Sequence, residues 1–399
     1  MAGEVSEARA GRIYLRAGRD GPVRGGNPWI FSQAIARVEP GELPPGARAE
    51  VYDAGGDLIG AGYYNPRTTI AVRMLVWGEA PPLSEIIARR VDRAIQLRRS
   101  FVRGDTDSYR LINGDGDALS GVVVDRYGDV LVVQLLTAGA DLMRDRVVET
   151  LAARIAPRAI IERSQGAVRK QEGLGDRSGV LMGEPVAEVV GLENGVRFVA
   201  DLERGQKTGS FLDQRENHAL AAALSAGARV LDACCYGGGF TLAALKGGAK
   251  SVAAVDTSAR ALEMLKRNLE LNGFENAQVE AIHGEAAEFM AASEKKFDLV
   301  VLDPPPLARS RADAERAGRL YTELNAFAIR MLAPGGRMLT FSCSAHFRGE
   351  SFVQAVRIAQ AKARRGLRML RHLGPGPDHP ALLGHAEGEY LTGLLLADL

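Results

Sequence analysis

The stretch RVLDACCYGGGF, residues Arg229–Phe240, decides the fold class of this chain. An apolar run ends at the acid Asp232, a triple glycine follows, and a helical pattern begins directly after it. A strand, a glycine-rich turn and a helix in this order are typical of an open α/β sheet, whose ligands bind beyond the carboxyl ends of the strands. Glycine permits a tight turn and lets a ligand approach the backbone closely. The stretch therefore predicts a ligand site that includes Asp232, Tyr236, Gly237 and Gly239.

The length, composition and net charge of the chain are those expected of an ordinary soluble globular protein. The chain has 399 residues, of which 46% are hydrophobic and 25% charged, and this length predicts two or three domains. A net charge of +1 makes no global electrostatic case for nucleic acid. Only three cysteines are present, two of them adjacent, so neither a disulfide framework nor a metal site is expected. We find no signal peptide and no membrane-spanning run, which predicts a cytoplasmic protein without a membrane partner.

Three regions differ in pattern. Residues 1–80 read as short strands separated by Gly and Pro, and residues 81–190 mix helical and strand patterns. Residues 191–399 alternate strands with helices, which predicts a doubly wound α/β sheet. Its strands are expected at Arg229–Asp232, Ser251–Asp256, Ala277–His283, Phe297–Asp303, Gly336–Phe341 and Glu389–Leu396.

An arginine-rich helix is expected at Ser84–Arg103. Apolar residues recur with helical spacing, and the same segment carries six arginines. A solvated helix face and an RNA-contacting face explain these arginines equally well.

The second strand supports a nucleoside ligand. Asp256 ends this strand 24 residues after Asp232, where a carboxylate can accept hydrogen bonds from both ribose hydroxyls. That spacing would also serve NAD, but Gly237-Gly238-Gly239 is not the G-x-G-x-x-G pattern that cradles a pyrophosphate. S-adenosylmethionine (SAM) therefore fits better. Glu285, after the third strand, is placed to accept the adenine amino group, although a plain surface acid is the alternative.

Two later strand ends suggest the reaction. The fourth strand runs into Asp303-Pro304-Pro305, a polar residue followed by two prolines that is typical of methyltransferases acting on bases, and the fifth ends at Ser342-Cys343-Ser344. Because these strands are neighbours in the topology, Asp303 and Cys343 should face one cleft. A thiolate that adds to carbon 6 of cytosine makes carbon 5 nucleophilic toward a sulfonium methyl. Cys343 would be this nucleophile, and Asp303 would hydrogen-bond the ring and, if protonated, supply the N3 proton. A buried small hydrophobe is the alternative for Cys343.

With these residues in view, the sequence resembles the PUA-domain class I methyltransferases that modify cytosine C5 in large-subunit ribosomal RNA. The resemblance covers nearly the whole chain. It rests on residues 26–31 and 60–65 in the first region, on residues 113–117 and 124–128 in the second, and on residues 205–217, 303–305, 342–344 and 378–380 in the third. The family usually has an aromatic residue and a serine where Cys234 and Cys235 stand.

The resemblance implies a three-domain enzyme: a PUA-like β-rich domain at 1–80, a central α/β domain at 81–190 and a SAM-dependent methyltransferase domain at 191–399. Asp232, Asp256, Glu285 and Asp303 fall on cofactor-site positions, and Cys343 on the proposed nucleophile. The polar stretch 204–217 precedes the first strand of the sheet and can fold over the ligand pocket. Its predicted cofactor contacts are Lys207, Thr208, Phe211 and Asp213.

RNA, in particular large-subunit ribosomal RNA, is the implied partner, and a homodimer is compatible with the sequence. The target base must be unpaired or flipped out to reach the edge of the sheet. Two other readings stay open. A guanine N-methyltransferase would also use Asp-Pro-Pro but would need no cysteine. A non-catalytic RNA-binding or ribosome-assembly protein could retain the same fold.

Overall fold

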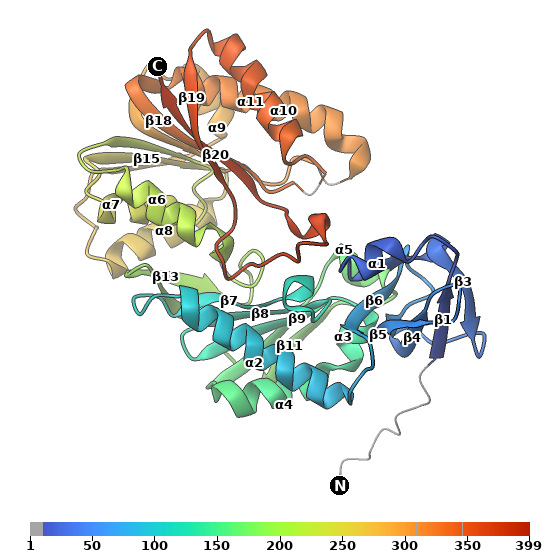
Figure 1. Cartoon of the computed structure of the whole chain (residues 1–399). Helices are drawn as coiled ribbons and strands as arrows, with labels where there is room; N and C mark the ends of the chain where they lie inside the picture. The colour runs from blue at the N-terminus through green and yellow to red at the C-terminus, as the bar shows by residue number, and fades with distance from the viewer. Residues whose placement is uncertain (1–10, 309, 345) are drawn as a thin grey trace. The chain divides into compact units, whose positions relative to one another are not determined.

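The structure is a computed structural model that describes residues 11–308, 310–344 and 346–399. The chain forms two compact units (Figure 1). The first contains the residues up to Val189, with Ala200–Ser210 and Pro377–Gly388; the second contains Val190–Val199, Phe211–Gly376 and Glu389–Leu399. The predicted PUA-like and central regions lie in the first unit. The chain passes from the first unit to the second at several points, one of which is the predicted pocket-covering stretch 204–217.

The first unit contains two sheets. One has the strand order β2-β6-β5-β4-β1-β3 and the other the order β11-β10-β9-β8-β7. The strands are β1 (Gly11–Leu15), β2 (Trp29–Phe31), β3 (Ile35–Glu39), β4 (Ala47–Tyr52), β5 (Leu58–Tyr64), β6 (Ile70–Trp77), β7 (Ser108–Asn113), β8 (Val122–Tyr127), β9 (Val130–Leu135), β10 (Ala159–Ser164) and β11 (Arg177–Met182). The helices are α1 (Gly21–Arg24), α2 (Leu83–Phe101), α3 (Ala138–Leu142), α4 (Arg144–Ile155) and α5 (Ala167–Gln171). A further pair, β12 (Glu188–Glu193) and β13 (Val196–Asp201), leads into the second unit.

The arginine-rich helix is α2, and its arginines differ in role. Arg98 is buried, and its guanidinium donates to both carboxylate oxygens of Asp117 at 2.6 and 2.7 Å. Arg89 is exposed and pairs with Glu85 one turn away. Arg98 is therefore a structural residue that holds α2 against the loop after β7. For the exposed arginines, a solvated helix face and an RNA-contacting face both stay open.

The second unit is built on a seven-stranded sheet with the order β16-β15-β14-β17-β18-β20-β19. Its strands are β14 (Arg229–Ala233), β15 (Ser251–Asp256), β16 (Val279–His283), β17 (Phe297–Leu302), β18 (Leu332–Ser342), β19 (Leu367–Leu373) and β20 (Thr392–Asp398). β14 to β18 are mutually parallel, and β20 is antiparallel to both of its neighbours. The predicted doubly wound α/β fold is confirmed. The edge strand β19 was not predicted.

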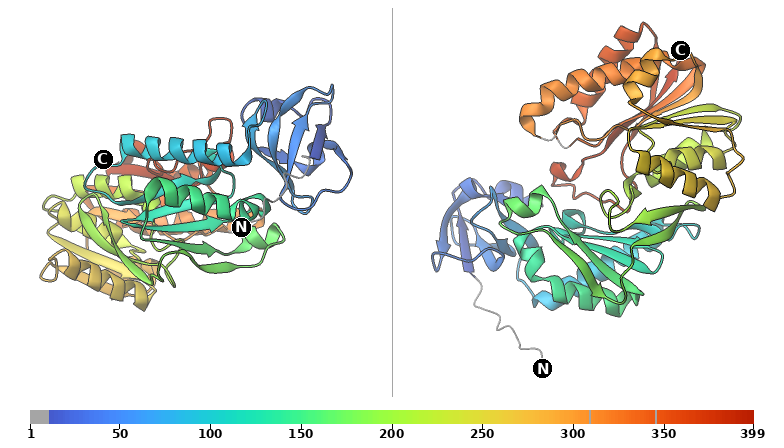
Figure 2. Two further views of the ribbon diagram at one scale, coloured as in Figure 1. Left: turned by 90° about the horizontal axis from the view of Figure 1, so that it is seen from below. Right: turned by 180° about the vertical axis from the view of Figure 1, so that it is seen from behind.

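Helices cover both faces of this sheet (Figure 1, Figure 2). Their bounds are α6 (Arg215–Ala223), α7 (Gly239–Lys246), α8 (Ala259–Leu271), α9 (Ala286–Ala292), α10 (Ala314–Arg330) and α11 (Glu350–Ala363). Apolar residues of α9, α10 and α11 form one core with Leu302, Leu394 and Leu396 of the sheet. Residues of α6 and α7 form another core with Phe341 and Leu395 on the opposite face. The strands between the two edges of the sheet are therefore buried on both sides, and polar groups collect where the parallel strands end.

Candidate functional site

The loop after β14 begins with a buried acid. Asp232 is 0% exposed, and its Oδ2 accepts hydrogen bonds from the backbone N–H and the hydroxyl of Thr241 at 3.0 and 2.7 Å. Its Oδ1 has no hydrogen-bond partner among the described residues. Burial raises the pKa of Asp232 to about 6. The structure therefore gives this predicted cofactor residue an interior role: it holds the first turn of α7.

The triple glycine is required by packing inside the protein. A Cβ on Gly237 would lie 2.9 Å from Sδ of Met264, and one on Gly238 would collide with Leu265 of α8. A Cβ on Gly239 would lie 2.6 Å from two atoms of the His218 ring. Gly238 also has φ +84°, which favours glycine. The tight turn is as expected, and these Cβ positions point at α8 and α6, so packing inside the protein by itself favours glycine at all three positions. The close approach of a ligand to this turn stays a prediction.

The predicted cofactor residues Phe211, Tyr236 and Asp256 come together. The backbone N–H of Tyr236 donates to Oδ2 of Asp256 at 2.8 Å, and Ser258 N–H donates to Oδ1 at 2.8 Å. The Tyr236 ring packs edge-on against Phe211, with 5.1 Å between centroids. Asp256 is thus fixed at the carboxyl end of β15, where each carboxylate oxygen keeps capacity to accept a further hydrogen bond.

Four acids surround Cys234. Burial raises the pKa of the Cys234 thiol, and the negative charges of Asp303, Asp256, Asp232 and Glu285 raise it further. Burial likewise raises the pKa of the Cys235 thiol. Burial and the nearby acids thus favour the neutral thiol in both groups. The four acids predicted at separate strand ends therefore all lie near enough to Cys234 to act on its thiol.

A chain of amides holds Asp303. The Gln214 Nε2 donates to Oδ2 of Asp303 at 2.9 Å, and the Asn217 Nδ2 donates to Oε1 of Gln214 at 2.6 Å. The same Asn217 nitrogen donates to the carbonyl of Gly374 at 3.1 Å. Gln214 and Asn217 are both buried. The sequence indicated only a polar stretch here, and the three-residue spacing at the start of a helix was the available signal for this pair.

Cys343 lies beside the loop that follows Asp303. Its Sγ–H donates to the carbonyl of Pro304 at 3.7 Å, and the side chain is half-buried. The neighbouring Ser344 hydroxyl accepts from the N–H groups of Leu307 and Ala308 at 3.0 and 3.2 Å. These contacts tie the end of β18 to the Asp303-Pro304-Pro305 loop. The expected adjacency of the fourth and fifth strands is confirmed, and it brings the thiol to the loop that carries the carboxyl group.

The remaining candidates lie on both sides of the boundary between the two units. Lys207 and Thr208 belong to the first unit, where the Thr208 hydroxyl is buried and donates to Asp125 at 2.6 Å. Asp213 belongs to the second unit, where its Oδ2 accepts from the Tyr390 hydroxyl at 2.7 Å. The Thr208 side chain is therefore engaged within the first unit, and a cofactor contact for it stays a prediction.

One residue behind the glycine loop was missed. Nδ1 of His218 lies 2.6 Å from the carboxylate of Glu193, and its ring packs edge-on against Phe240. Burial acts to lower the pKa of His218, but the Glu193 carboxylate and the nearby acids Asp232 and Asp303 outweigh burial, so the pKa is raised. His218 is therefore protonated more readily than a free imidazole, and it lies behind the acidic edge. No spacing pattern in the sequence linked it to Glu193, which is 25 residues away.

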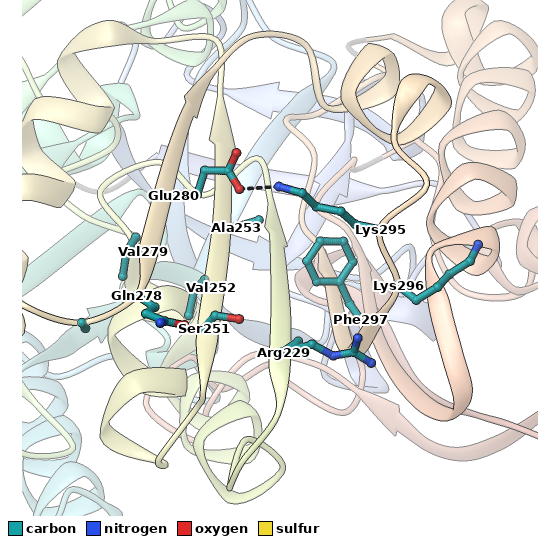
Figure 3. A pocket seen from close by; sticks show the side chains of 11 residues that line it. Arg229, Ser251, Val252, Ala253, Gln278, Val279, Glu280, Lys295, Lys296 and Phe297 are labelled. Carbon is teal, nitrogen blue, oxygen red and sulfur yellow. Dashed lines mark hydrogen bonds and ion pairs between the residues drawn. The ribbon is translucent and has the colours of Figure 1, made fainter.

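A pocket at the other end of the sheet is a separate feature (Figure 3). It is lined by residues at the beginnings of β14 to β17, including Arg229, Ser251 and Phe297, with the Lys295–Glu280 ion pair beside them. Ligands of such sheets bind at the carboxyl ends, so this pocket is not the candidate site. Among the residues described, no group of acids, histidines or cysteines is arranged to hold a metal ion. Nor does any described helix have the length and apolar character needed to span a bilayer.

Comparison with known proteins agrees with this geometry. The profile of the S-adenosylmethionine-dependent methyltransferase family matches residues 117–386, and that of a PUA-like domain matches residues 13–77. A solved structure from Streptococcus mutans superposes with a TM-score of 0.82 at 19% identity, covering 97% of this chain and 99% of that one, so the two proteins share a fold. The fold and the site thus define a SAM-dependent methyltransferase with a PUA-like domain.

Relatives narrow the family further. The ribosomal RNA large subunit methyltransferase I of Aeromonas hydrophila is 38% identical over 391 residues, covering 96% of this chain and 98% of that protein. The proteins of the same name from Alteromonas mediterranea and Vibrio cholerae are 37% and 38% identical with the same coverage. This chain belongs to the ribosomal RNA large subunit methyltransferase I family, and the resemblance seen in the sequence is confirmed.

SAM is the cofactor of this class, and the carboxyl edge of the sheet fits it. Asp256 offers fixed acceptors of the kind that ribose hydroxyls require. The acids around Cys234 make the edge negative, which complements the sulfonium and ammonium charges of SAM. Glu285 is exposed at the end of β16, where an exocyclic amino group could donate to it.

Proposed function

We propose that this protein methylates carbon 5 of a cytosine in large-subunit ribosomal RNA, through a covalent adduct at Cys343. The observation that carries the proposal is the contact between Cys343 Sγ and the carbonyl of Pro304, next to Asp303. The names of the relatives supply the RNA class. A metal or redox step is not needed, because a thiol and a carboxyl group suffice for this chemistry.

The steps follow from these two residues. Cys343 loses its proton to solvent, and the thiolate adds to carbon 6 of the base while the N3 position takes a proton from Asp303. Carbon 5 is now the nucleophilic end of an enamine, and bound SAM supplies the sulfonium methyl group that it attacks. Loss of the carbon-5 proton to solvent then re-forms the double bond and breaks the carbon–sulfur bond, which returns the thiolate, and N3 gives its proton back to Asp303.

Asp303 needs a defined orientation to serve the base. Because Gln214 donates to Oδ2, this oxygen acts as an acceptor, and a proton carried by Asp303 resides on Oδ1. Gln214 is thus a positioning residue that selects which oxygen meets the base. Phe211, Tyr236, Asp256 and Glu285 are the cofactor contacts that we propose first for this reaction, and the remaining contacts predicted from the sequence stay predictions.

The test is methyl transfer to large-subunit RNA that lacks modification, followed by digestion and mass spectrometry of the nucleosides. We expect 5-methylcytidine. A methylguanosine product would support the guanine alternative, and SAM binding without transfer to any RNA would support the non-catalytic one.

The covalent step is tested with Cys343→Ala, with Cys235→Ala as the matched control because this buried thiol has no proposed role. Cys343→Ala should abolish transfer and keep SAM affinity, whereas Cys235→Ala should stay active. RNA that contains 5-fluorocytidine has no carbon-5 proton to lose, so it should remain attached to the wild-type protein and not to Cys343→Ala. Full activity of Cys343→Ala would remove the covalent mechanism.

A further inference from the structure

The edge strand β19 presents an unusual set of exposed side chains. Its sequence is LRMLRHL, and five consecutive residues from Arg368 to His372 are exposed. Met369 and Leu370 are 48% and 54% exposed. One side of β19 pairs with β20, and the strand is the last in the sheet. Long apolar side chains and arginines thus alternate along an open edge.

A bulge places the arginines on one face. In a regular strand, residues three apart point to opposite faces. The register between β19 and β20 shifts between Met369 and Arg371, so that Arg368 pairs with Ala397 and Arg371 with Leu395. Leu395 belongs to the core under α6 and α7. Ala397 lies two residues from Leu395 in β20, so Arg368 and Arg371 both point to that face.

A third arginine lies in the same row. Arg337 of β18 pairs with Ala397 from the other side. Arg337, Ala397 and Arg368 therefore stand side by side across three strands, and Arg337 is exposed as well. In the part of the chain that the structure describes, no ion pair is recorded for Arg337, Arg368 or Arg371. We call these three residues the arginine strip.

The chain segment that contains β19 is basic. Residues 351–377 contain six Lys or Arg residues and no Asp or Glu, although the whole chain has 50 basic and 49 acidic residues. Two of the six are engaged elsewhere: Arg357 pairs with Glu350, and Arg365 bonds to Asp398. Single charges of either sign would suffice to protect an open edge from aggregation. The excess of basic residues in this segment, four of which have no ion pair within the described part of the chain, instead favours an anionic partner.

The strip leads toward the candidate site. Phe341 of β18 pairs with Gly393 of β20, and Gly393 pairs with Leu373 of β19. Cys343 follows two residues after Phe341, so the carboxyl end of β19 reaches the same edge as the thiol. The two strands are separated by two strand spacings, roughly 10 Å. Nucleotides flanking a base at Cys343 would therefore pass within reach of Arg371.

A second copy of the chain is a poorer occupant. Pairing of two β19 edges would bring the arginines of one copy close to those of the other, and like charges across a strand pair are destabilising. We infer that the arginine strip binds the phosphates of RNA next to the target nucleotide, with Met369 and Leu370 offering apolar contact. This inference rests on the proposed function for its substrate but concerns a separate surface.

The experiment measures binding of an unmodified large-subunit RNA transcript at several salt concentrations, together with the KM for RNA and the kcat. The double variant Arg368→Gln/Arg371→Gln removes two cations. Each phosphate contact on a single strand contributes about 0.7 to the slope of log affinity against log salt, so the slope should fall by about 1.4. We expect the KM for RNA to rise about tenfold, with kcat at saturating RNA and SAM affinity unchanged.

The control is Arg229→Gln/Lys295→Gln, which removes the same charge at the amino ends of the strands, where both cations already pair with acids. An unchanged salt slope in Arg368→Gln/Arg371→Gln, or one equal to the control, overturns the inference. So does a change in oligomeric state with unaltered RNA affinity, which would assign the edge to a second copy. A wild-type protein that binds RNA through the strip but forms no 5-methylcytidine would refute the proposed function alone.

Discussion

Replacement of Gln214 by Leu tests how Asp303 is held. The carbonyl of Gly374 can only accept, so the Asn217 amide must present its nitrogen there. That nitrogen also donates to Gln214, which fixes the Gln214 oxygen on this side and directs its nitrogen to Asp303. The orientation of the Gln214 amide therefore follows from a backbone group far along the chain.

The expected loss can be estimated from this one hydrogen bond. A hydrogen bond to a charged group contributes about 1.5–3 kcal/mol. At about 1.4 kcal/mol per factor of ten, Gln214→Leu should lower kcat about 10- to 150-fold. Affinity for SAM and the thermal midpoint should change little by comparison, because Asn217 keeps its bond to Gly374. Single-turnover methyl transfer at saturating RNA is the assay.

Gln214→Glu is the matched variant, because it keeps an oxygen for Asn217 but opposes Asp303 with a second carboxyl group. When that carboxyl is protonated it can donate to Asp303 again, so activity relative to wild type should recover as the pH falls. A purely structural role would not produce this pH dependence. A kcat for Gln214→Leu within twofold of wild type, or a loss in Gln214→Glu that is the same at every pH, would refute the reasoning.

Three further predictions concern the residues behind the site. The pKa of His218 is raised on folding, so its pair with Glu193 stabilises the protein fully below about pH 6.5 and less as the pH rises through the pKa of the folded state. Glu193→Gln should therefore reduce the difference in the free energy of unfolding between pH 6 and pH 9, measured by urea unfolding. Gly239→Ala should lower the free energy of unfolding by about 1–3 kcal/mol, because the added Cβ meets the His218 ring. Gly284→Ala is the control: its added Cβ meets nothing within 4 Å, so thermal unfolding should be nearly unchanged. The pKa of Asp232 is raised on folding to about 6, so its ionisation destabilises the protein progressively between the unfolded value of about 3.9 and the folded value. The stability advantage of Asp232→Asn over wild type should therefore grow between about pH 4 and pH 6 and level off at about 3 kcal/mol above that, and a difference that stays constant from pH 4 to 7 would contradict this.

Much of the fold and part of the site could be predicted. The alternation of strand patterns with helix patterns located the five parallel strands β14 to β18 and also β20. Most of these strands are buried on both faces, so they appear in the sequence as apolar runs between turns. β19 escaped this reasoning because it is an exposed edge in which arginines interrupt the apolar residues. The acids at Asp256 and Asp303 could be placed together because the ends of parallel strands share one edge of a sheet.

The sequence by itself determined the fold class, the family and the chemical groups at the carboxyl edge, since these depend on local periods and on motifs of a few residues. Only the tertiary structure decided what those groups touch. It packs the glycines of the opening stretch against His218 and α8. It orients the Gln214 amide toward Asp303, because the carbonyl of Gly374 fixes the neighbouring Asn217 amide. It also brought Arg368 and Arg371 to one face through a bulge. Such relations depend on the register and the hydrogen-bond partners of residues far apart in the chain, which no local pattern encodes.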